Sequence, residues 1–291
     1  MSTEIMIAIG TVIFLIFVFT RLNRDDSSVA NGKPNPDISP ETVCENDVTD
    51  EQEAAITEKE ASFLASAQQS LYLGEPFPST EITEAWSKHQ HITWLSHGVS
   101  EWVAVFSEVG YLNQRWYKGG GFPVSEIAQG WDEGYELTAS TYLNNEWLVV
   151  LSKTANPVLQ RWQLTDNFPA DTIQTNWNDG FQITGLAFTE NQWLSVYTQA
   201  APDSLQRWFI SDQFPGHEIS QGWDEGFSVT ALVHGHGQWV LVMSTSPQPC
   251  LQRWHLTENF PQDSIKQGWD EGYRIMQIAY GNGHWALVLG Q

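Results

Sequence analysis

The sequence is poor in cysteine and in positive charge. Only two cysteines occur among the 291 residues, Cys44 in a polar stretch and Cys250 between two repeats, so no structural disulfide is expected. Thirteen Lys and Arg stand against 35 Asp and Glu, which gives a net charge of −22. A chain with this excess of negative charge repels phosphate backbones, which argues against nucleic acid as a partner.

Motifs of catalysis and metal binding are also missing. The sequence contains no G-x-S-x-G or H-E-x-x-H motif, and the run Gly119–Gly121 lacks the Gly-Lys-Ser/Thr ending of a phosphate loop. The histidine pairs His89/His91 and His234/His236 do not recur with any period and have no cysteine nearby. We therefore expect no catalytic residues, no metal and no cofactor.

Long apolar runs are absent except for one near the N-terminus. Residues 5–20 are uncharged and mostly apolar, and Arg21 and Arg24 follow them. A helix of this length spans about 24 Å, slightly less than a hydrocarbon core of about 30 Å. Leu22 and the flanking arginines, which can extend toward the head groups, supply the difference. We expect a single transmembrane helix at residues 5–22.

A cleaved signal peptide is the competing interpretation of this run. Against it, the four preceding residues contain an acid and no base, and no small-residue cleavage site follows. Because the arginines follow the anchor, the positive-inside bias predicts an N-terminus outside and a cytoplasmic repeat domain. An extracytoplasmic repeat domain is the alternative.

Two further segments precede the repeats. Residues 23–48 are rich in Asp, Asn, Ser and Pro and cannot bury enough apolar surface to offset the entropy of ordering, so they predict a disordered linker. Thr49 and Gln52 then fit a capping box, and apolar residues alternate with acids up to Ala67. This pattern predicts an amphipathic helix at residues 49–68, which either caps one side of the repeats or binds a partner.

The dominant feature of the chain is a repeat of 46 residues. One unit has Gln-Arg-Trp, then Phe-Pro, then a Trp that a Gly follows three residues later. Four clear copies carry these residues in register: Gln114-Arg115-Trp116, Phe122-Pro123, Trp131 and Gly134; Gln160-Arg161-Trp162, Phe168-Pro169, Trp177 and Gly180; Gln206-Arg207-Trp208, Phe214-Pro215, Trp223 and Gly226; Gln252-Arg253-Trp254, Phe260-Pro261, Trp269 and Gly272. A fixed period of this size indicates stacked or ring-closed units.

The third unit, residues 160–205, shows how one repeat is expected to fold. Alternation predicts a strand at 160–165, and Phe168-Pro169 opens a short helix that Gly180 ends. Residues 181–188 and 192–198 then form a hairpin. A fifth, weaker copy precedes the four clear ones, with Phe77-Pro78, Trp86 and Trp102 at the expected positions, Leu71 where the first Trp should be, and Trp94 outside the pattern.

Five such units predict a mainly β domain at residues 69–291, with a short helix in each repeat and the indoles in the core. No polar terminal repeat is visible, which favours a closed ring of the five-bladed β-propeller type over an open, twisted stack. In this arrangement a blade would contain the second and third strands of one unit and the first strand of the next. Residues 69–73 would complete the last blade.

The repeated pattern FP-x-x-x-I-x-x-x-W-D-E-G-Y/F-x-I-T, followed by a strand rich in Trp, Val and Leu, has a known counterpart. It resembles the uncharacterised tryptophan-rich repeat domain found after casein-kinase-1-like kinase domains in plants and in bacterial caspase-like proteins. The resemblance covers about residues 69–291 and implies an accessory module rather than an enzyme. The resemblance assigns no functional residues to this chain, and neither a kinase nor a caspase-like segment is present.

Acidic side chains recur where the helix dipole disfavours them, at the helix C-terminus. A compensating cation is expected, and the arginine of Gln-Arg-Trp has the same period. The predicted pairs join Arg115, Arg161, Arg207 and Arg253 to acids at Asp132, Asp179, Asp224 and Asp270. Calcium bound by the acids is the alternative, although the dense oxygen-ligand spacing of a calcium loop is absent.

Two functions remain from the sequence. In the first, the repeats form a membrane-anchored, non-catalytic scaffold that binds a protein partner. In the second, exposed indoles stack on sugars and the domain is a multivalent carbohydrate-binding module outside the cytoplasm. The sequence does not name the partner or ligand.

Overall fold

The computed structural model describes residues 62–66, 68–246 and 250–291. The predicted anchor (5–22), the predicted linker (23–48) and most of the predicted helix (49–68) lie outside these ranges. No helix within them is long and apolar enough to span a membrane.

The end of the predicted helix is a strand instead. Ser62–Ala65 form β1, which pairs antiparallel with β2 (Gln69–Gly74). A short helix is marginal in water by itself, whereas a sheet edge offers hydrogen-bond partners to four consecutive residues. The edge of β2 therefore decides the conformation of this segment.

Each repeat folds as a strand, a two-turn helix and two further strands, as the sequence predicts. In the third unit these elements are β8 (Gln160–Thr165), α3 (Ala170–Asn178), β9 (Phe181–Phe188) and β10 (Trp193–Gln199). The other units contain, in the same order, β2, α1 (Ser79–Ser87), β3 (Gln90–His97) and β4 (Trp102–Glu108); β5 (Asn113–Gly119), α2 (Val124–Asp132), β6 (Tyr135–Leu143) and β7 (Glu146–Lys153); β11 (Gln206–Ser211), α4 (Gly216–Asp224), β12 (Phe227–Gly235) and β13 (Gln238–Thr245); β14 (Gln252–Thr257), α5 (Gln262–Asp270), β15 (Arg274–Gly281) and β16 (His284–Gly290). The mainly β class and the five repeated three-stranded sheets are confirmed.

The helices begin and end where local chemistry favours it. In the third unit, Pro169 is the N-cap of α3, and its carbonyl accepts a 2.8 Å hydrogen bond from the Ile173 amide. Ile173 is fully buried and anchors the helix. Gly180 follows with φ of +81°, a left-handed conformation that glycine adopts without strain.

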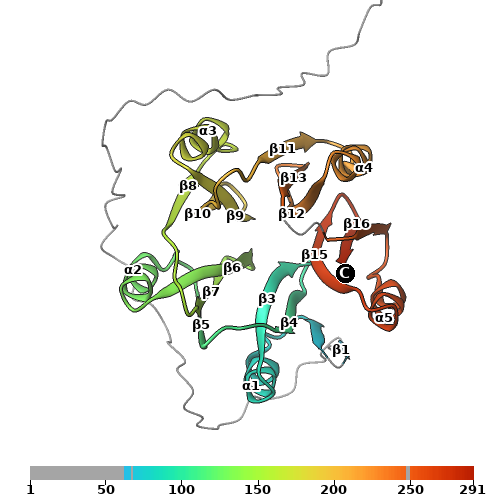
Figure 1. Ribbon diagram of the computed structural model, residues 1–291. Coiled ribbons are helices and arrows are strands. Elements are labelled where there is room, and N and C mark those ends of the chain that lie inside the picture. The colour runs from blue at the N-terminus through green and yellow to red at the C-terminus, as the bar shows by residue number, and fades with distance from the viewer. Residues whose placement is uncertain (1–61, 67, 247–249) are drawn as a thin grey trace, which may run out of the picture. The chain divides into compact units, whose positions relative to one another are not determined.

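The three strands of each sheet come from one unit, in the order first, third, second. The prediction that a sheet borrows its first strand from the next unit is wrong, because β8 pairs with β10 and β2 pairs with β4. The helix carries the chain from one side of the sheet to the other, and the third strand returns between the first two. We call the first strand of a unit the outer strand and the second strand the inner strand. In Figure 1 the helices lie at the periphery and the inner strands lie toward the middle.

The inner strands contact one another in sequence: β3 with β6, β6 with β9, β9 with β12, and β12 with β15. β15 also contacts β3, so the last unit lies beside the first. At this contact the Trp94 indole N–H donates a 2.9 Å hydrogen bond to the carbonyl of Ile278. Trp94, the tryptophan outside the repeat pattern, therefore links the first and last units.

Neighbouring units are joined by the glutamine of Gln-Arg-Trp. The carboxamide oxygen of Gln206 accepts from the Trp177 indole N–H (3.0 Å) and from the Ile183 amide (2.8 Å), both in the preceding unit. Its nitrogen donates to the Ile183 carbonyl and to the Ser244 hydroxyl, each at 2.9 Å. All four hydrogen-bonding positions of the carboxamide are thus used, and we call this arrangement a glutamine joint.

The same joint recurs between all successive units. The preceding-unit indoles of the other joints are Trp86 for Gln114, Trp131 for Gln160 and Trp223 for Gln252. A fifth joint connects the last unit to the first, because Gln69 accepts from Trp269 (2.9 Å) and from the Ile275 amide (2.7 Å). Residues 200 positions apart in the sequence therefore make the contact that neighbouring units make elsewhere.

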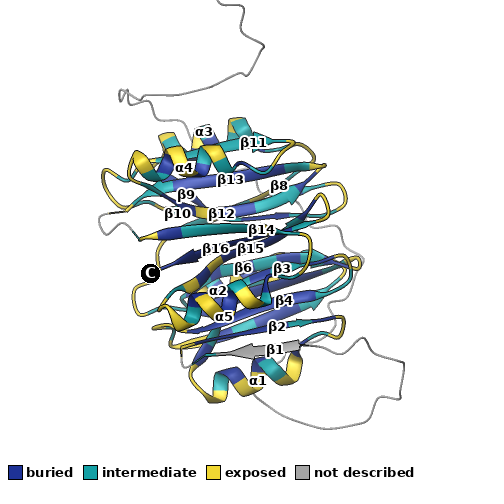
Figure 2. Ribbon diagram, turned by 90° about the vertical axis from the view of Figure 1, so that its right-hand side faces the viewer, coloured by how far each residue is buried: buried dark blue, intermediate teal, exposed yellow. Residues whose placement is uncertain are grey.

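Aromatic rings fill the space between the sheets. Phe168 packs edge-on against Trp193 of its own unit, with ring centroids 5.6 Å apart, and against Trp208 of the next unit at 4.9 Å. The same two contacts are made by Phe77 with Trp102 and Trp116, by Phe122 with Trp147 and Trp162, and by Phe214 with Trp239 and Trp254. Most of the core is therefore shared between units. In Figure 2 the buried residues lie mainly in the strands, and the exposed residues lie mainly on the helices and turns.

Candidate functional site

The two ends of the sheets form different surfaces. The connection face carries the starts of the outer strands, the helix C-termini and the connections between units (109–112, 154–159, 200–205 and 250–251). The hairpin face carries the helix N-termini and the turns between the second and third strands of each unit. The antiparallel register places these features at opposite ends of every sheet.

On the connection face, each repeated arginine forms an ion pair with the end of its own helix. The distances are 2.6 Å for Arg115–Glu133 and Arg161–Asp179 and 2.5 Å for Arg207–Glu225. Arg253 pairs in the same way with Glu271.

The predicted partners need correction in three of the four units. Arg161 pairs with Asp179 as predicted, but the other arginines pair with the glutamate that follows Asp132, Asp224 or Asp270. A glutamine one turn earlier, such as Gln129 for Glu133, donates a hydrogen bond that orients this glutamate (2.7 Å). In the third unit Asp179 occupies the position of the glutamate.

Each guanidinium also stacks on the aromatic residue that opens the inner strand. Its central carbon lies 4.2 Å from the ring centre of Tyr135 for Arg115 and 3.9 Å from that of Phe181 for Arg161. Arg207 on Phe227 and Arg253 on Tyr273 repeat the contact. The arginine is thus held between a carboxylate and a ring, which fixes the helix end to the outer strand.

The contacts of the three paired glutamates, Glu133, Glu225 and Glu271, favour the ionised form. The hydrogen bond from Gln129, and then that from the Arg115 guanidinium, lower the pKa of Glu133 below its ordinary value. The pKa values of Glu225 and Glu271 are lowered by the same two kinds of contact. These side chains are engaged in structural contacts and are not placed as proton donors.

Four leucines of the connections are exposed on the same face. Leu112 and Leu159 are each 65% exposed, Leu205 is 61% exposed and Leu251 is 63% exposed. Their backbones are ordered, since the Leu159 carbonyl accepts a 2.9 Å hydrogen bond from the Gln199 amide. The sequence carried a signal that was missed: a leucine directly precedes Gln-Arg-Trp in three units.

The hairpin face is acidic. Its turns and helix starts carry Glu101, Glu126, Glu146, Asp166, Asp171, Glu190, Asp212, Glu218, Glu258 and Asp263. In the described part of this face Lys118 is the single Lys or Arg, and it lies 2.5 Å from Glu146. The repeated arginines lie on the connection face, where acids at the helix ends pair with them.

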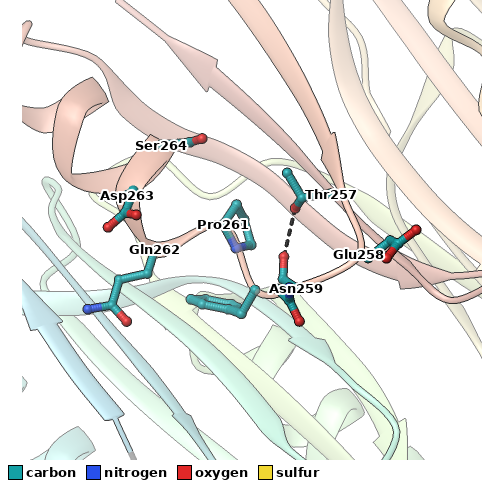
Figure 3. Close-up of a pocket in the computed structure, with 8 residues that line it drawn as sticks. Thr257, Glu258, Asn259, Pro261, Gln262, Asp263 and Ser264 are labelled. Carbon is teal, nitrogen blue, oxygen red and sulfur yellow. Dashed lines mark hydrogen bonds between the residues drawn. The ribbon is translucent and has the colours of Figure 1, made fainter.

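Two of the hollows in the described part of the chain bear on a possible binding site. One is a shallow depression of about 470 Å³ lined by residues 257–264, the turn between β14 and α5. Figure 3 shows these residues and the 2.7 Å hydrogen bond from the Thr257 hydroxyl to the Asn259 carbonyl. All of the lining residues are consecutive, so this is the concave side of one turn.

The second hollow, of about 40 Å³, lies between the five inner strands. Trp94 lines it, and Gln277 nearby donates 3.0 Å to the Thr230 carbonyl. The equivalent positions in the other units carry only Ala139, Gly185 and Ala231. The remaining space suits one or two water molecules rather than an organic ligand.

Four of the histidines are partly or largely buried. Burial lowers the pKa of His91, His97, His234 and His255. Among the described residues no three His, Cys, Asp or Glu side chains are grouped to hold a metal ion. Cys250 has a free thiol, and Cys44 lies outside the described residues.

A family model of unknown function, DUF7477, matches two overlapping stretches of the chain, residues 77–207 and 194–291. The chain belongs to the DUF7477 family. Two matches to one model agree with an internally repeated domain. No curated protein and no solved structure gave a match. The DUF7477 match gives no activity or ligand, and the association with kinases and caspase-like proteins stays a prediction.

Proposed function

We propose that this domain is a non-catalytic scaffold that binds a protein partner on its connection face. The observation that carries the proposal is the set of exposed leucines Leu112, Leu159, Leu205 and Leu251. Single exposed leucines are common, but here they recur in four successive connections. Leu159, Leu205 and Leu251 directly precede Gln-Arg-Trp, and Leu112 lies one residue earlier in its unit. Ion pairs lie beside them, and apolar anchors within a polar surround are the usual composition of a protein interface.

We also propose that the five sheets close into a five-bladed ring of the β-propeller type. The contact of β15 with β3 supports this arrangement, and so does the glutamine joint between Gln69 and Trp269. In a closed ring the four leucines surround one end of the axis. A partner can then contact several units at once, which raises its affinity without requiring a strong contact at any one of them.

The non-catalytic part of the proposal rests on how the repeated polar groups are used. Gln206 has all its hydrogen-bonding positions occupied by neighbours, and Arg207 is held between Glu225 and Phe227. The glutamine holds neighbouring units together, and the arginine holds the helix end to the outer strand of its own unit. The carbohydrate alternative is not carried forward, because it requires exposed indoles and all fifteen tryptophans are buried or half-buried.

We propose further that residues 5–22 tether the scaffold to a membrane, with the N-terminus outside and the repeats in the cytoplasm. The uncharged run and the arginines that follow it support this orientation. The extracytoplasmic orientation is the alternative outcome of the test below.

The proposal is tested by proximity labelling with an enzyme fused after Gln291 of the full chain, in cells that produce the protein. Substitution of the four leucines by serine should abolish labelling of the partner. A matched control changes the four helix-start acids Glu126, Asp171, Glu218 and Asp263 to serine and should retain it. Identical labelling patterns for the two variants would contradict a binding role for the connection face. The compartment of the labelled proteins reports the orientation.

A further inference from the structure

The first sheet differs from the other four in having an added strand. β1 pairs antiparallel with the outer strand β2, with Ser62 opposite Leu73, Leu64 opposite Leu71 and Ala65 opposite Ser70. The tight turn into β2 is closed by a 2.7 Å hydrogen bond from the Ser66 amide to the Gln69 carbonyl. The outer side of this sheet therefore accepts a short extended segment.

The equivalent side of the other sheets carries no strand in the described ranges. β5, β8, β11 and β14 each pair with one strand only. Each helix packs on the inner strand of its own unit.

The register identifies the backbone groups that face outward. The Gln199 amide donates to the Leu159 carbonyl, so Leu159 faces the sheet. The backbone N–H and C=O groups of neighbouring residues in a strand point to opposite edges. Those of Arg161 therefore also point toward the third strand, and those of Trp162 and Leu164 point away from the sheet. In the first unit the corresponding outward residues are Leu71 and Leu73, which β1 covers.

Three of the uncovered strands lack several of the features that normally protect an edge, and the one charged residue in each, Arg161, Arg207 or Arg253, is engaged in an ion pair. Natural edges carry proline, lysine or a bulge that blocks pairing. The outer strands β8, β11 and β14 contain no proline, and their register with the third strand is continuous. At the outward position where β5 has Lys118, they have Leu164, Ile210 and Leu256.

We propose that β8, β11 and β14 each bind an extended, uncharged segment of a partner protein as an added antiparallel strand. The register is the one that β1 uses on β2, so the partner residue in the place of Leu64 lies opposite Trp162, Trp208 or Trp254. Backbone hydrogen bonds supply the attraction, as in other cases of strand addition. Leu159, Leu205 and Leu251 directly precede these strands, but the added strand would use the outward backbone groups of the strands and not the leucine side chains. The inference therefore does not depend on the proposed function.

The probe for this inference is a fluorescent peptide with the uncharged sequence of residues 61–68, titrated into the detergent-solubilised full chain. Fluorescence anisotropy should show saturable binding of three peptides per chain. A peptide with proline in place of Leu64 lacks the central backbone donor and should bind at least tenfold more weakly. Absence of saturation, or equal binding of the two peptides, would overturn the proposal.

A pair of variants tests the edge itself. The outward amide of Leu256 is not used within its own sheet, so L256P leaves the hydrogen bonds to β16 in place while blocking the added strand. L256A loses the same side chain but keeps the amide. Peptide stoichiometry should fall from three to two in L256P and stay at three in L256A, with folding checked by circular dichroism. A variant lacking the four exposed leucines should bind the peptide like the wild type.

Discussion

The first unit and the four clear units differ in which of the repeated residues they contain. The first unit has Ser70 where the others have the repeated arginine, and Leu71 where they have tryptophan. It keeps Gln69, Phe77 and the indole of Trp86. The ion pair with the helix end has been lost without loss of the fold, whereas the groups that join units are present everywhere. The comparison indicates that the joints, and not the charges, determine this architecture.

The largest effect is expected from breaking a joint. Q206L leaves the Trp177 indole N–H and the Ile183 backbone groups without partners, and Q69L does the same to Trp269 and Ile275. Each should lower the free energy of unfolding by about 3–6 kcal/mol, measured by urea denaturation of the full chain. Q163L, at an exposed position, should change it by less than about 0.5 kcal/mol. If Q69L costs far less than Q206L, the last and first units are not joined as the others are, and the ring proposal fails.

The next effect concerns the aromatic packing between units. F214A removes the ring between Trp239 and Trp254 and should cost about 3–5 kcal/mol in the same measurement. F260A should cost less, because Leu71 stands where the others have a tryptophan. Equal losses would show that the leucine replaces the indole fully.

Restoring the repeat pattern in the first unit should also be unfavourable. Leu71 is completely buried, so L71W has no space for the larger side chain and should lower stability by about 1–3 kcal/mol. Thermal unfolding followed by circular dichroism measures this. A stabilised variant would mean that the first unit tolerates the ordinary pattern.

The pH dependence of the free energy of unfolding is expected to differ between the first and second units, because two partly buried histidines belong to the first unit. His91 and His97 have pKa values lowered from 6.5 by burial, so the unfolded chain takes up protons first as the pH falls. Stability should be complete above pH 6.5 and decline below it. H97Y, which copies Tyr142 of the second unit, should reduce this decline between pH 7 and pH 5 in urea denaturation. An unchanged slope would show that His97 does not contribute.

The smallest effect is expected from copying the first unit into a clear unit. R207S removes the pair with Glu225 and the contact with Phe227, but the glutamate is exposed. The loss should be about 1 kcal/mol or less, and 1 M NaCl should reduce it further. A loss as large as that of Q206L would reverse the conclusion drawn from Ser70.

Periodicity alone was enough to predict the elements of each unit, since β8 and β9 have the bounds expected from the sequence. The composition of the sheets was not predictable, because the connection 154–159 has the length of a hairpin yet leads to a different sheet. The glutamine joint was not predicted, because glutamine is usually an exposed polar residue. Its contribution to stability comes from hydrogen-bond partners in another unit, which the sequence of its own unit does not reveal. Likewise, the sequence identified charge compensation at the helix end, but the choice of Glu133 over Asp132 depends on the direction of the side chain.

One joint lacks a hydroxyl partner that the other four joints have. Gly290 stands where the other units have a serine or threonine, and Cys250 and Met276 lie where its side chain would be. The carboxamide nitrogen of Gln252 therefore donates to the Val229 carbonyl without the additional hydroxyl. Opening between the fourth and fifth units is the expected route of local fluctuation. The amide proton of Val229 should then exchange with deuterium faster than those of Ile183 and Ile275.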